Sequence, residues 1–204
     1  MKILCHRGYW NKPDQQNTIA SFKSALTKDY GVEIDVRDFN EEIVISHDIP
    51  TKESPKLETL LAEGLHHNLC LAFNIKSDGI CLGLKKLIDE FSVSEYFCFD
   101  MSIPQQIHYQ NMELTWYSRT SDHNEEKVLN SNSHGIWLDC FYSNWWRKEN
   151  LSQIANKKPI AIVSPELHGR EHRIMWQEIK NLGNLHNVFL CTDFPNEAKS
   201  FFYD

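Results

Sequence analysis

Short apolar runs alternate with longer amphipathic segments along the whole chain, a pattern typical of repeated strand–helix units. The predicted strands are 2–6, 31–37, 42–47, 69–76, 95–100, 114–119, 135–141, 159–167 and 188–193. The predicted helices are 17–30, 55–66, 80–91, 103–112, 148–157, 170–182 and 196–202. Because no Pro/Gly/Ser-rich linker, internal repeat or low-complexity tract divides the chain, we expect a single α/β domain over 1–204.

The run 42–47 follows the second strand closely, and we expect the two to pair as a β-hairpin. With this run set aside, about eight strand–helix units remain, which is the number in a closed (β/α)8 TIM barrel. An open doubly wound sheet uses the same alternation and is the alternative architecture. We predict the single (β/α)8 barrel.

Polar residues gather where the predicted strands end. In a parallel α/β barrel, catalytic groups project from the carboxyl ends of the strands, so these positions are the first candidates for a site. They are His6 and Arg7, His47 and Asp48, Asn74 and Lys76, Arg119, Asp139, Glu166 and His168, and Thr192 and Asp193.

The second strand, GVEIDV, places Glu33 and Asp35 together on the face opposite its valines and isoleucine. Two carboxylates that face one interior repel each other and are costly to desolvate. A divalent cation removes both problems, and hard oxygen ligands select Mg²⁺, Ca²⁺ or Mn²⁺ over zinc. The alternative is a solvated edge strand in which both carboxylates pair with Arg37 or a lysine.

Other strand-end residues suit chemistry around such a cation. Asn74 can add a neutral carbonyl ligand, and His6 and His47 can act as general acid and base because imidazole titrates near neutral pH. Arg7 and Lys76 bring positive charge that suits a phosphate. The alternatives are packed or surface histidines and a lysine that extends from a strand end into solvent.

Composition narrows the class of protein further. A net charge of −7 argues against a nucleic-acid binder, which needs dense Lys and Arg. The scattered cysteines form no CxxC pair, so we expect buried thiols in a reducing compartment. The N-terminus leaves no room for a signal peptide, and no apolar run approaches the roughly 20 residues of a membrane span. We therefore expect a cytoplasmic enzyme without stable membrane insertion, whose oligomeric state the sequence leaves open.

Taken together, the motifs resemble the glycerophosphodiester phosphodiesterase family, within the wider phospholipase-C-like barrel group. The matching segments are His6-Arg7-Gly8, Asn17-Thr18, Gly31 to Val36, His47-Asp48, PKLETLL (55–61) and LCTDFPNEA (190–198). They occur in the family's order along the chain, and those in the N-terminal third are the most specific.

The resemblance implies a (β/α)8 barrel that uses Mg²⁺, Ca²⁺ or Mn²⁺ to hydrolyse a small-molecule phosphodiester. The expected substrate is a glycerophosphodiester, or a sugar- or glycerol-linked phosphodiester, cleaved to glycerol phosphate or its equivalent and an alcohol, in lipid and glycerol metabolism. The roles carried over are acid/base catalysis for His6 and His47, metal binding for Glu33 and Asp35, and phosphate binding for Arg7 and Lys76.

The chain also departs from the family pattern. Gln16 replaces a glutamate before Asn17, and Asn74 replaces the glutamate expected as third metal ligand, which removes a negative charge. The short link after Asp48 leaves no room for the usual inserted subdomain, so this is a short member. The seventh strand reads IVSPELHGR in place of a tryptophan–threonine pair.

That departure suggests residues that contact the substrate. If the strand continues to 167, Ser164, Glu166 and His168 share the inward face, with Arg170 just beyond. They can then bind hydroxyls or an amine of the leaving group, the alternative being a charge cluster at a helix N-terminus. An aromatic set near Asp139 can stack on a sugar or quaternary amine, or simply pack as a loop: Trp137, Tyr142, Trp145 and Trp146.

Two further functions stay open. A phospholipase-D-like lyase would stop at a cyclic phosphate. A non-catalytic descendant would bind phosphate esters without turning them over, as the loss of carboxylates at Gln16 and Asn74 suggests.

Overall fold

The computed structural model describes residues 1–123, 132–148, 151, 155, 157–183 and 185–203, and it divides into two compact units. The N-terminal unit comprises Cys5–Trp116, and the C-terminal unit comprises Met1–Leu4 with Tyr117–Asp204. Strand β1 (Lys2–His6) begins in the C-terminal unit and ends in the N-terminal unit.

The N-terminal unit contains β2 (Gly31–Phe39), β3 (Glu42–Ile45), β4 (Leu71–Ile75) and β5 (Tyr96–Phe99). The strand order is β5-β4-β2-β1, with β2–β4 and β4–β5 parallel. Strand β3 pairs antiparallel with β2, which confirms the predicted hairpin. The register of β2 and β4 sets Asp35 opposite Asn74, so the polar ends of these strands are neighbours.

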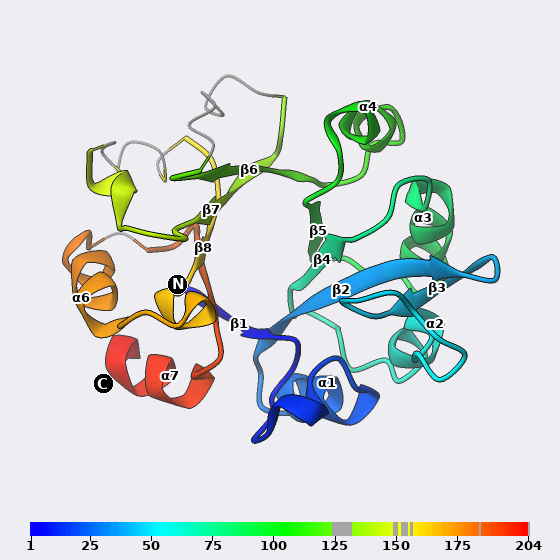
Figure 1. Cartoon of the computed structure of the whole chain (residues 1–204), viewed down its shortest axis with the longest axis horizontal. Helices are drawn as coiled ribbons and strands as arrows, with labels where there is room; N and C mark the ends of the chain where they lie inside the picture. The colour runs from blue at the N-terminus through cyan, green and yellow to red at the C-terminus, as the bar shows by residue number, and fades with distance from the viewer. Residues whose placement is uncertain (124–131, 149–150, 152–154, 156, 184, 204) are drawn as a thin grey trace. The chain divides into compact units, whose positions relative to one another are not determined.

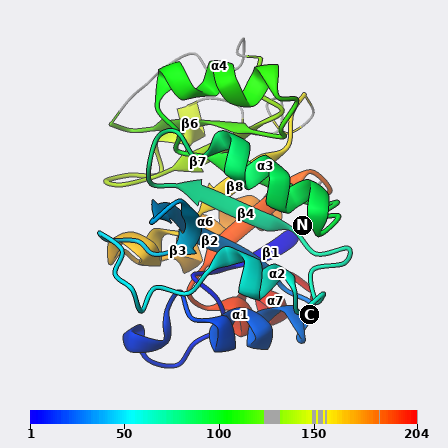
Figure 2. The same ribbon diagram turned by 90° about the vertical axis from the view of Figure 1, so that its right-hand side faces the viewer.

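Helices α1 (Ile19–Leu26), α2 (Leu57–Leu61), α3 (Cys81–Glu90) and α4 (Ile103–Asn111) alternate with these strands, preceded by the 3₁₀ turn η1 (Pro13–Gln15). Thr18 caps α1, since its Oγ1 accepts a hydrogen bond of 3.1 Å from the Ser21 amide. In the view of Figure 2, α2 and α3 lie in front of β2 and β4. Helices α1, α2 and α3 bury apolar residues against the sheet side, and α4 buries Tyr109 while its Ile103 and Ile107 are exposed; the buried residues of the first three include Phe22, Leu26, Leu57, Leu61, Leu84 and Ile88.

The C-terminal unit contains β6 (Tyr117–Ser121), β7 (Gly135–Asp139), β8 (Ile160–Val163) and β9 (Val188–Thr192), in the order β1-β9-β8-β7-β6. Strands β6 to β9 are parallel. Helices α6 (Arg173–Asn181) and α7 (Pro195–Tyr203) lie on one side of β8 and β9 (Figure 1). The fully buried Trp176 of α6 contacts Phe201 and Phe202 of α7, at ring-centroid distances of 5.7 and 5.8 Å.

Several element boundaries differ from the prediction. The predicted strand 159–167 ends at Val163, as β8, because Pro165 lacks an amide hydrogen and starts the 3₁₀ turn η4 (Pro165–His168). The sixth starts at Tyr117 rather than 114, because the Leu114 amide donates to the Tyr109 carbonyl and closes the end of α4. The turn η3 (Trp145–Lys148) follows β7, and the predicted helix 148–157 falls largely outside the described residues.

All six cysteines are buried and none is in a disulfide, as predicted. Among the helices that the structure describes, none combines the length and apolar character needed to cross a bilayer.

Candidate active site

The two carboxylates of β2 are buried in the N-terminal unit. Glu33 is 1% exposed and Asp35 is 0% exposed, so the interpretation of β2 as a solvated edge strand is wrong. Arg37 does not pair with them, since its Nε and Nη2 both donate to the His47 carbonyl oxygen at 3.1 Å. The carboxylates therefore need partners from other strands.

Asp35 receives two cations and an amide. Its Oδ2 lies 2.9 Å from Arg7 Nε and accepts a 2.8 Å hydrogen bond from Asn17 Nδ2. Its Oδ1 lies 3.3 Å from Lys76 Nζ. Both cationic side chains remain about one-fifth exposed, at 21% for Arg7 and 19% for Lys76. Each therefore contacts the buried carboxylate at one end and solvent at the other.

Glu33 has weaker compensation. Its Oε1 accepts a 2.9 Å hydrogen bond from Asn74 Nδ2, and its Oε2 accepts a 3.3 Å bond from the Arg7 amide. Burial first, and then the charge of Asp35, raise the pKa of Glu33 to about 7, although His6, Asn74 and Lys76 act in the opposite direction. The local field therefore favours an additional positive charge at Glu33.

The backbone turn after β1 delivers Arg7 to this place. Arg7 has a left-handed φ of 57°, and its carbonyl oxygen accepts hydrogen bonds from the Asn17 amide at 3.0 Å and Ser21 Oγ at 3.3 Å. Gly8 has φ 93°, and a Cβ there would lie 2.4 Å from Ser21 Oγ. The glycine of the His-Arg-Gly motif is therefore required by packing. Gln16 Oε1, at the position of the family glutamate, accepts a 3.3 Å bond from Arg7 Nη1.

The two histidines follow strand ends in the same unit. His6 ends β1 half-buried and interacts electrostatically with Glu33. His47 follows β3 with its side chain 45% exposed, and its Nδ1 lies 2.9 Å from Asp48 Oδ1. The hydrogen bond to His47 is the largest cause of a lowered pKa at Asp48, and Arg7 contributes as well. The Asp48 contact at Nδ1 directs Nε2 of His47 away from Asp48.

Two amide oxygen atoms in this cluster are buried without a hydrogen-bond donor, Asn74 Oδ1 and Asn17 Oδ1, while Asp35 Oδ1 makes no hydrogen bond and faces Lys76 Nζ at 3.3 Å. Together with Glu33 they form a donor set of carboxylate and amide oxygens, which is the chemistry that Mg²⁺ and Ca²⁺ prefer. Within the described ranges, no group of three or more His, Cys, Asp or Glu residues is arranged to hold a metal ion. A cation here would therefore need amide oxygens, water or substrate oxygens to complete its coordination.

Glu166 lies in the C-terminal unit and is held by its neighbours. Its two carboxylate oxygens accept hydrogen bonds from Ser164 Oγ and Thr192 Oγ1, and the Asp193 amide adds a 3.2 Å bond. Ser164 Oγ in turn accepts a 2.8 Å bond from Trp176 Nε1. The expected alternation of Ser164 and Glu166 on one strand face is wrong, because both follow the end of β8. Glu166 instead links the ends of β8 and β9.

His168 belongs to a different set of contacts. Its Nε2 lies 2.6 Å from Asp139 Oδ1, while Arg119 Nη2 lies 2.5 Å from Asp139 Oδ2. Burial raises the pKa of Asp139, but the contacts with His168 and Arg119 outweigh burial and the pKa is lowered overall. The sequence marked these residues as strand-end polar groups without predicting that they pair.

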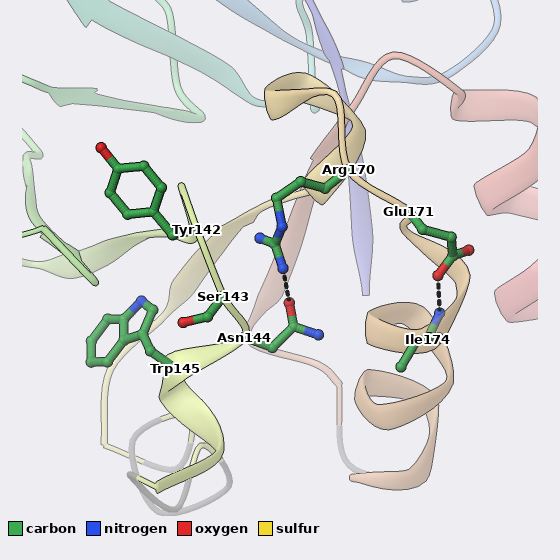
Figure 3. Close-up of a pocket in the computed structure, with 7 residues that line it drawn as sticks. All are labelled: Tyr142, Ser143, Asn144, Trp145, Arg170, Glu171 and Ile174. Carbon is green, nitrogen blue, oxygen red and sulfur yellow. Dashed lines mark hydrogen bonds between the residues drawn. The ribbon is translucent and has the colours of Figure 1, made fainter.

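The aromatic set divides by burial. Trp137 and Trp146 are 4% and 3% exposed, so neither can stack on a ligand. Tyr142 and Trp145 instead line a pocket of about 710 Å³ with Ser143, Asn144, Arg170, Glu171 and Ile174 (Figure 3).

No family model matches the sequence, and no curated protein matches it either. Solved structures do resemble it. A glycerophosphodiester phosphodiesterase from Parabacteroides distasonis has a TM-score of 0.75 at 16% identity, over 99% of this chain and 96% of that one. One from Agrobacterium tumefaciens has a TM-score of 0.69 at 16% identity, over 98% of both chains. A Ca²⁺-dependent phosphatidylinositol-specific phospholipase C from Streptomyces antibioticus has a TM-score of 0.62 at 7% identity, over 98% of this chain and 95% of that one.

These matches confirm the predicted fold class, a (β/α)8 TIM barrel, over almost the whole chain. Two of these fold relatives carry the name of the family that the sequence motifs resemble, so the resemblance is confirmed at the level of the fold.

Proposed function

We propose that the chain is a metal-dependent phosphodiesterase that hydrolyses a small glycerophosphodiester, or a sugar- or glycerol-linked phosphodiester. The observation that carries this proposal is the burial of both Glu33 and Asp35 on one strand, with Arg7 and Lys76 reaching Asp35 from the ends of two other strands. The fold likeness to proteins named as glycerophosphodiester phosphodiesterases, and to one named as a phospholipase C, supports it.

Glu33, Asp35 and Asn74 are the proposed metal ligands. The raised pKa of Glu33 and the donor-free amide oxygen of Asn74 both favour a hard cation, Mg²⁺, Ca²⁺ or Mn²⁺. When bound, the cation would withdraw charge from a phosphoryl oxygen. Because Asn74 is neutral, the site has fewer charged ligands than one with three carboxylates, and we expect weaker binding.

Arg7 and Lys76 are the proposed phosphate-binding residues. Each has one side turned to Asp35 and remains partly exposed, so a phosphate oxygen can reach either cation without breaking the ion pairs. A guanidinium offers several N–H donors in one plane, so Arg7 can hold Asp35 through Nε while presenting other donors to substrate.

His6 and His47 are the proposed acid and base. One imidazole takes a proton from the attacking water or substrate hydroxyl as the new P–O bond forms. The other gives a proton to the leaving alcohol oxygen as the old P–O bond breaks. The contact between His47 Nδ1 and Asp48 Oδ1 would fix the tautomer, so that Nε2 carries out the transfer.

His168 and Glu166 stay predicted substrate-binding residues with unequal support. The side chain of His168 is 21% exposed and held by Asp139, which suits contact with a substrate hydroxyl. A substrate would have to displace the internal hydrogen bonds of Glu166 to reach its carboxylate.

The test is ³¹P NMR of glycerophosphodiesters incubated with the protein and Mg²⁺, Ca²⁺ or Mn²⁺, with an EDTA control. We expect free glycerol phosphate, no product in EDTA, and a loss of roughly 10²-fold or more in rate for His6→Ala and His47→Ala. A stable cyclic phosphate as sole product would identify a lyase. No turnover of any diester, with retained binding, would identify a non-catalytic descendant, and full activity in EDTA would reject the metal.

A further inference from the structure

A second concentration of ligand-binding chemistry lies in the C-terminal unit, in the pocket of about 710 Å³ shown in Figure 3. This volume is in the range of small-molecule sites. Its walls come from the loop after β7 with the first residue of η3, and from the segment after η4 with the first turn of α6.

Arg170 gives the pocket its charge. Its Nη1 donates to the Cys140 carbonyl at 2.6 Å, and its Nη2 donates to Asn144 Oδ1 at 3.1 Å. Both acceptors are neutral, and no carboxylate within the described ranges lies at ion-pair distance from the guanidinium. Arg170 is therefore held in place by neutral acceptors, without a direct carboxylate partner among the described residues.

Glu171 does not pair with Arg170, although it also lines the pocket. Its carboxylate accepts hydrogen bonds from the Arg173 amide at 2.7 Å and the Ile174 amide at 3.2 Å, at the start of α6. These two bonds are the largest causes of its lowered pKa. Figure 3 shows the Glu171 carboxylate directed at Ile174 and away from Arg170. The Glu171 carboxylate is thus already bound by backbone amides at the start of α6.

Two aromatic rings stand on the other side of Arg170 (Figure 3). The Trp145 indole is fixed by a 2.8 Å hydrogen bond from its Nε1 to the Asp139 carbonyl, while Tyr142 is 74% exposed. The ring of Tyr142 is therefore accessible to a ligand. Flat ring systems stack on such side chains with little regard to their hydrogen-bonding groups.

The loop that carries these rings is ordered in advance. Asp122 accepts hydrogen bonds from the amides of Phe141, Tyr142 and Ser143 at 3.0, 2.7 and 2.8 Å. Three backbone donors on one carboxylate fix the path of the loop, so a ligand would lose little free energy in ordering it.

We propose that this pocket binds an organic anion that carries a flat ring, with its phosphate or carboxylate on Arg170 and its ring against Tyr142 and Trp145. The proposal does not rest on the phosphodiesterase function, because none of its residues belongs to the metal, histidine or phosphate-binding set of the N-terminal unit.

The test is isothermal titration calorimetry of the full chain with adenosine 5′-monophosphate, adenosine and inorganic phosphate. We expect saturable binding of the monophosphate, at least about 10-fold tighter than that of either fragment. Arg170→Gln should weaken monophosphate binding by roughly 10- to 100-fold and leave adenosine binding unchanged. Tyr142→Ala should weaken monophosphate and adenosine binding by the same factor, because it removes stacking alone.

Two controls make the result decisive. Arg173→Gln removes an exposed cation that pairs with Glu197 beside the pocket, and it should leave binding unchanged. Lys76→Gln should also leave monophosphate binding unchanged. If monophosphate binding depended on Lys76 and not on Arg170, the ligand would lie at the proposed phosphodiester site, and this proposal alone would be overturned. Should Arg170→Gln fail to fold, Tyr142→Ala decides, since the Tyr142 side chain is largely exposed. The proposal is wrong if the monophosphate shows no saturable binding, or if its binding is unaffected by both Arg170→Gln and Tyr142→Ala.

Discussion

The substitution Glu33→Gln isolates the energetic feature on which the active-site proposal depends, a carboxylate buried beside another carboxylate. Burial and Asp35 raise the pKa of Glu33 from 4.5 to about 7. A group whose folded-state pKa is raised binds more protons folded than unfolded, so its contribution to stability falls as the pH rises from about 4.5 through about 7. Glutamine carries no charge at any pH and lacks this loss.

The magnitude follows from the contacts. The difference between 4.5 and about 7 corresponds to roughly 3 kcal/mol of unfolding free energy in metal-free protein at pH 8. Glutamine can still accept the bond from Asn74 Nδ2, but its amide nitrogen cannot accept the bond from the Arg7 amide, which costs about 1 kcal/mol. We therefore expect Glu33→Gln to stabilise metal-free protein by roughly 2 kcal/mol at pH 8, and to destabilise it by about 1 kcal/mol near pH 4.5.

Urea denaturation in EDTA, at pH 4.5 and pH 8, measures this difference for the two proteins. Saturating Mg²⁺ or Ca²⁺ should then stabilise wild type and have far less effect on the variant, because only the native wild-type site binds the cation tightly. A difference between variant and wild type that is the same at both pH values would refute the claim that Glu33 carries an uncompensated charge.

Two further predictions test the surroundings of the site. Gly8→Ala should lower the unfolding free energy by at least roughly 2 kcal/mol, because its Cβ would meet Ser21. Gly79→Ala, at a similar φ of 87° with open space around it, should cost only about 1 kcal/mol. Equal costs in thermal unfolding would show that Ser21 does not restrict the turn. Asn74→Asp adds a third buried carboxylate, so it should tighten Mn²⁺ binding by about 10-fold or more in a calorimetric titration and destabilise metal-free protein. Unchanged Mn²⁺ affinity would remove position 74 from the ligand set.

Much of the fold was accessible from sequence because its periodicity is strong. The alternation in GVEIDV correctly predicted a strand with two carboxylates opposite its aliphatic residues, and all of these side chains are buried. The hairpin with 42–47 followed from the short connection. The strand predicted over 159–167 was too long, because an apolar run such as PIAIVSPEL does not show where pairing stops. Pro165 was the available signal.

The side-chain pairings were less accessible. The sequence predicted Asn74 as a strand-end ligand near Glu33 and Asp35, but nothing in it showed that Asn74 donates to Glu33 or that Asn17 donates to Asp35. Such bonds depend on rotamers and on the left-handed turn at Arg7, which is a non-glycine residue. The Asp122 contacts that fix the 141–143 loop likewise join residues about twenty positions apart, beyond any local signal.

Anomalous diffraction from crystals soaked in Mn²⁺ tests the central claim most directly. The account predicts a manganese peak in contact with carboxylate oxygens of both Glu33 and Asp35, and its loss in crystals of Glu33→Gln soaked in the same way. A map without density between these side chains, at Mn²⁺ concentrations that saturate any solution activity, would contradict it.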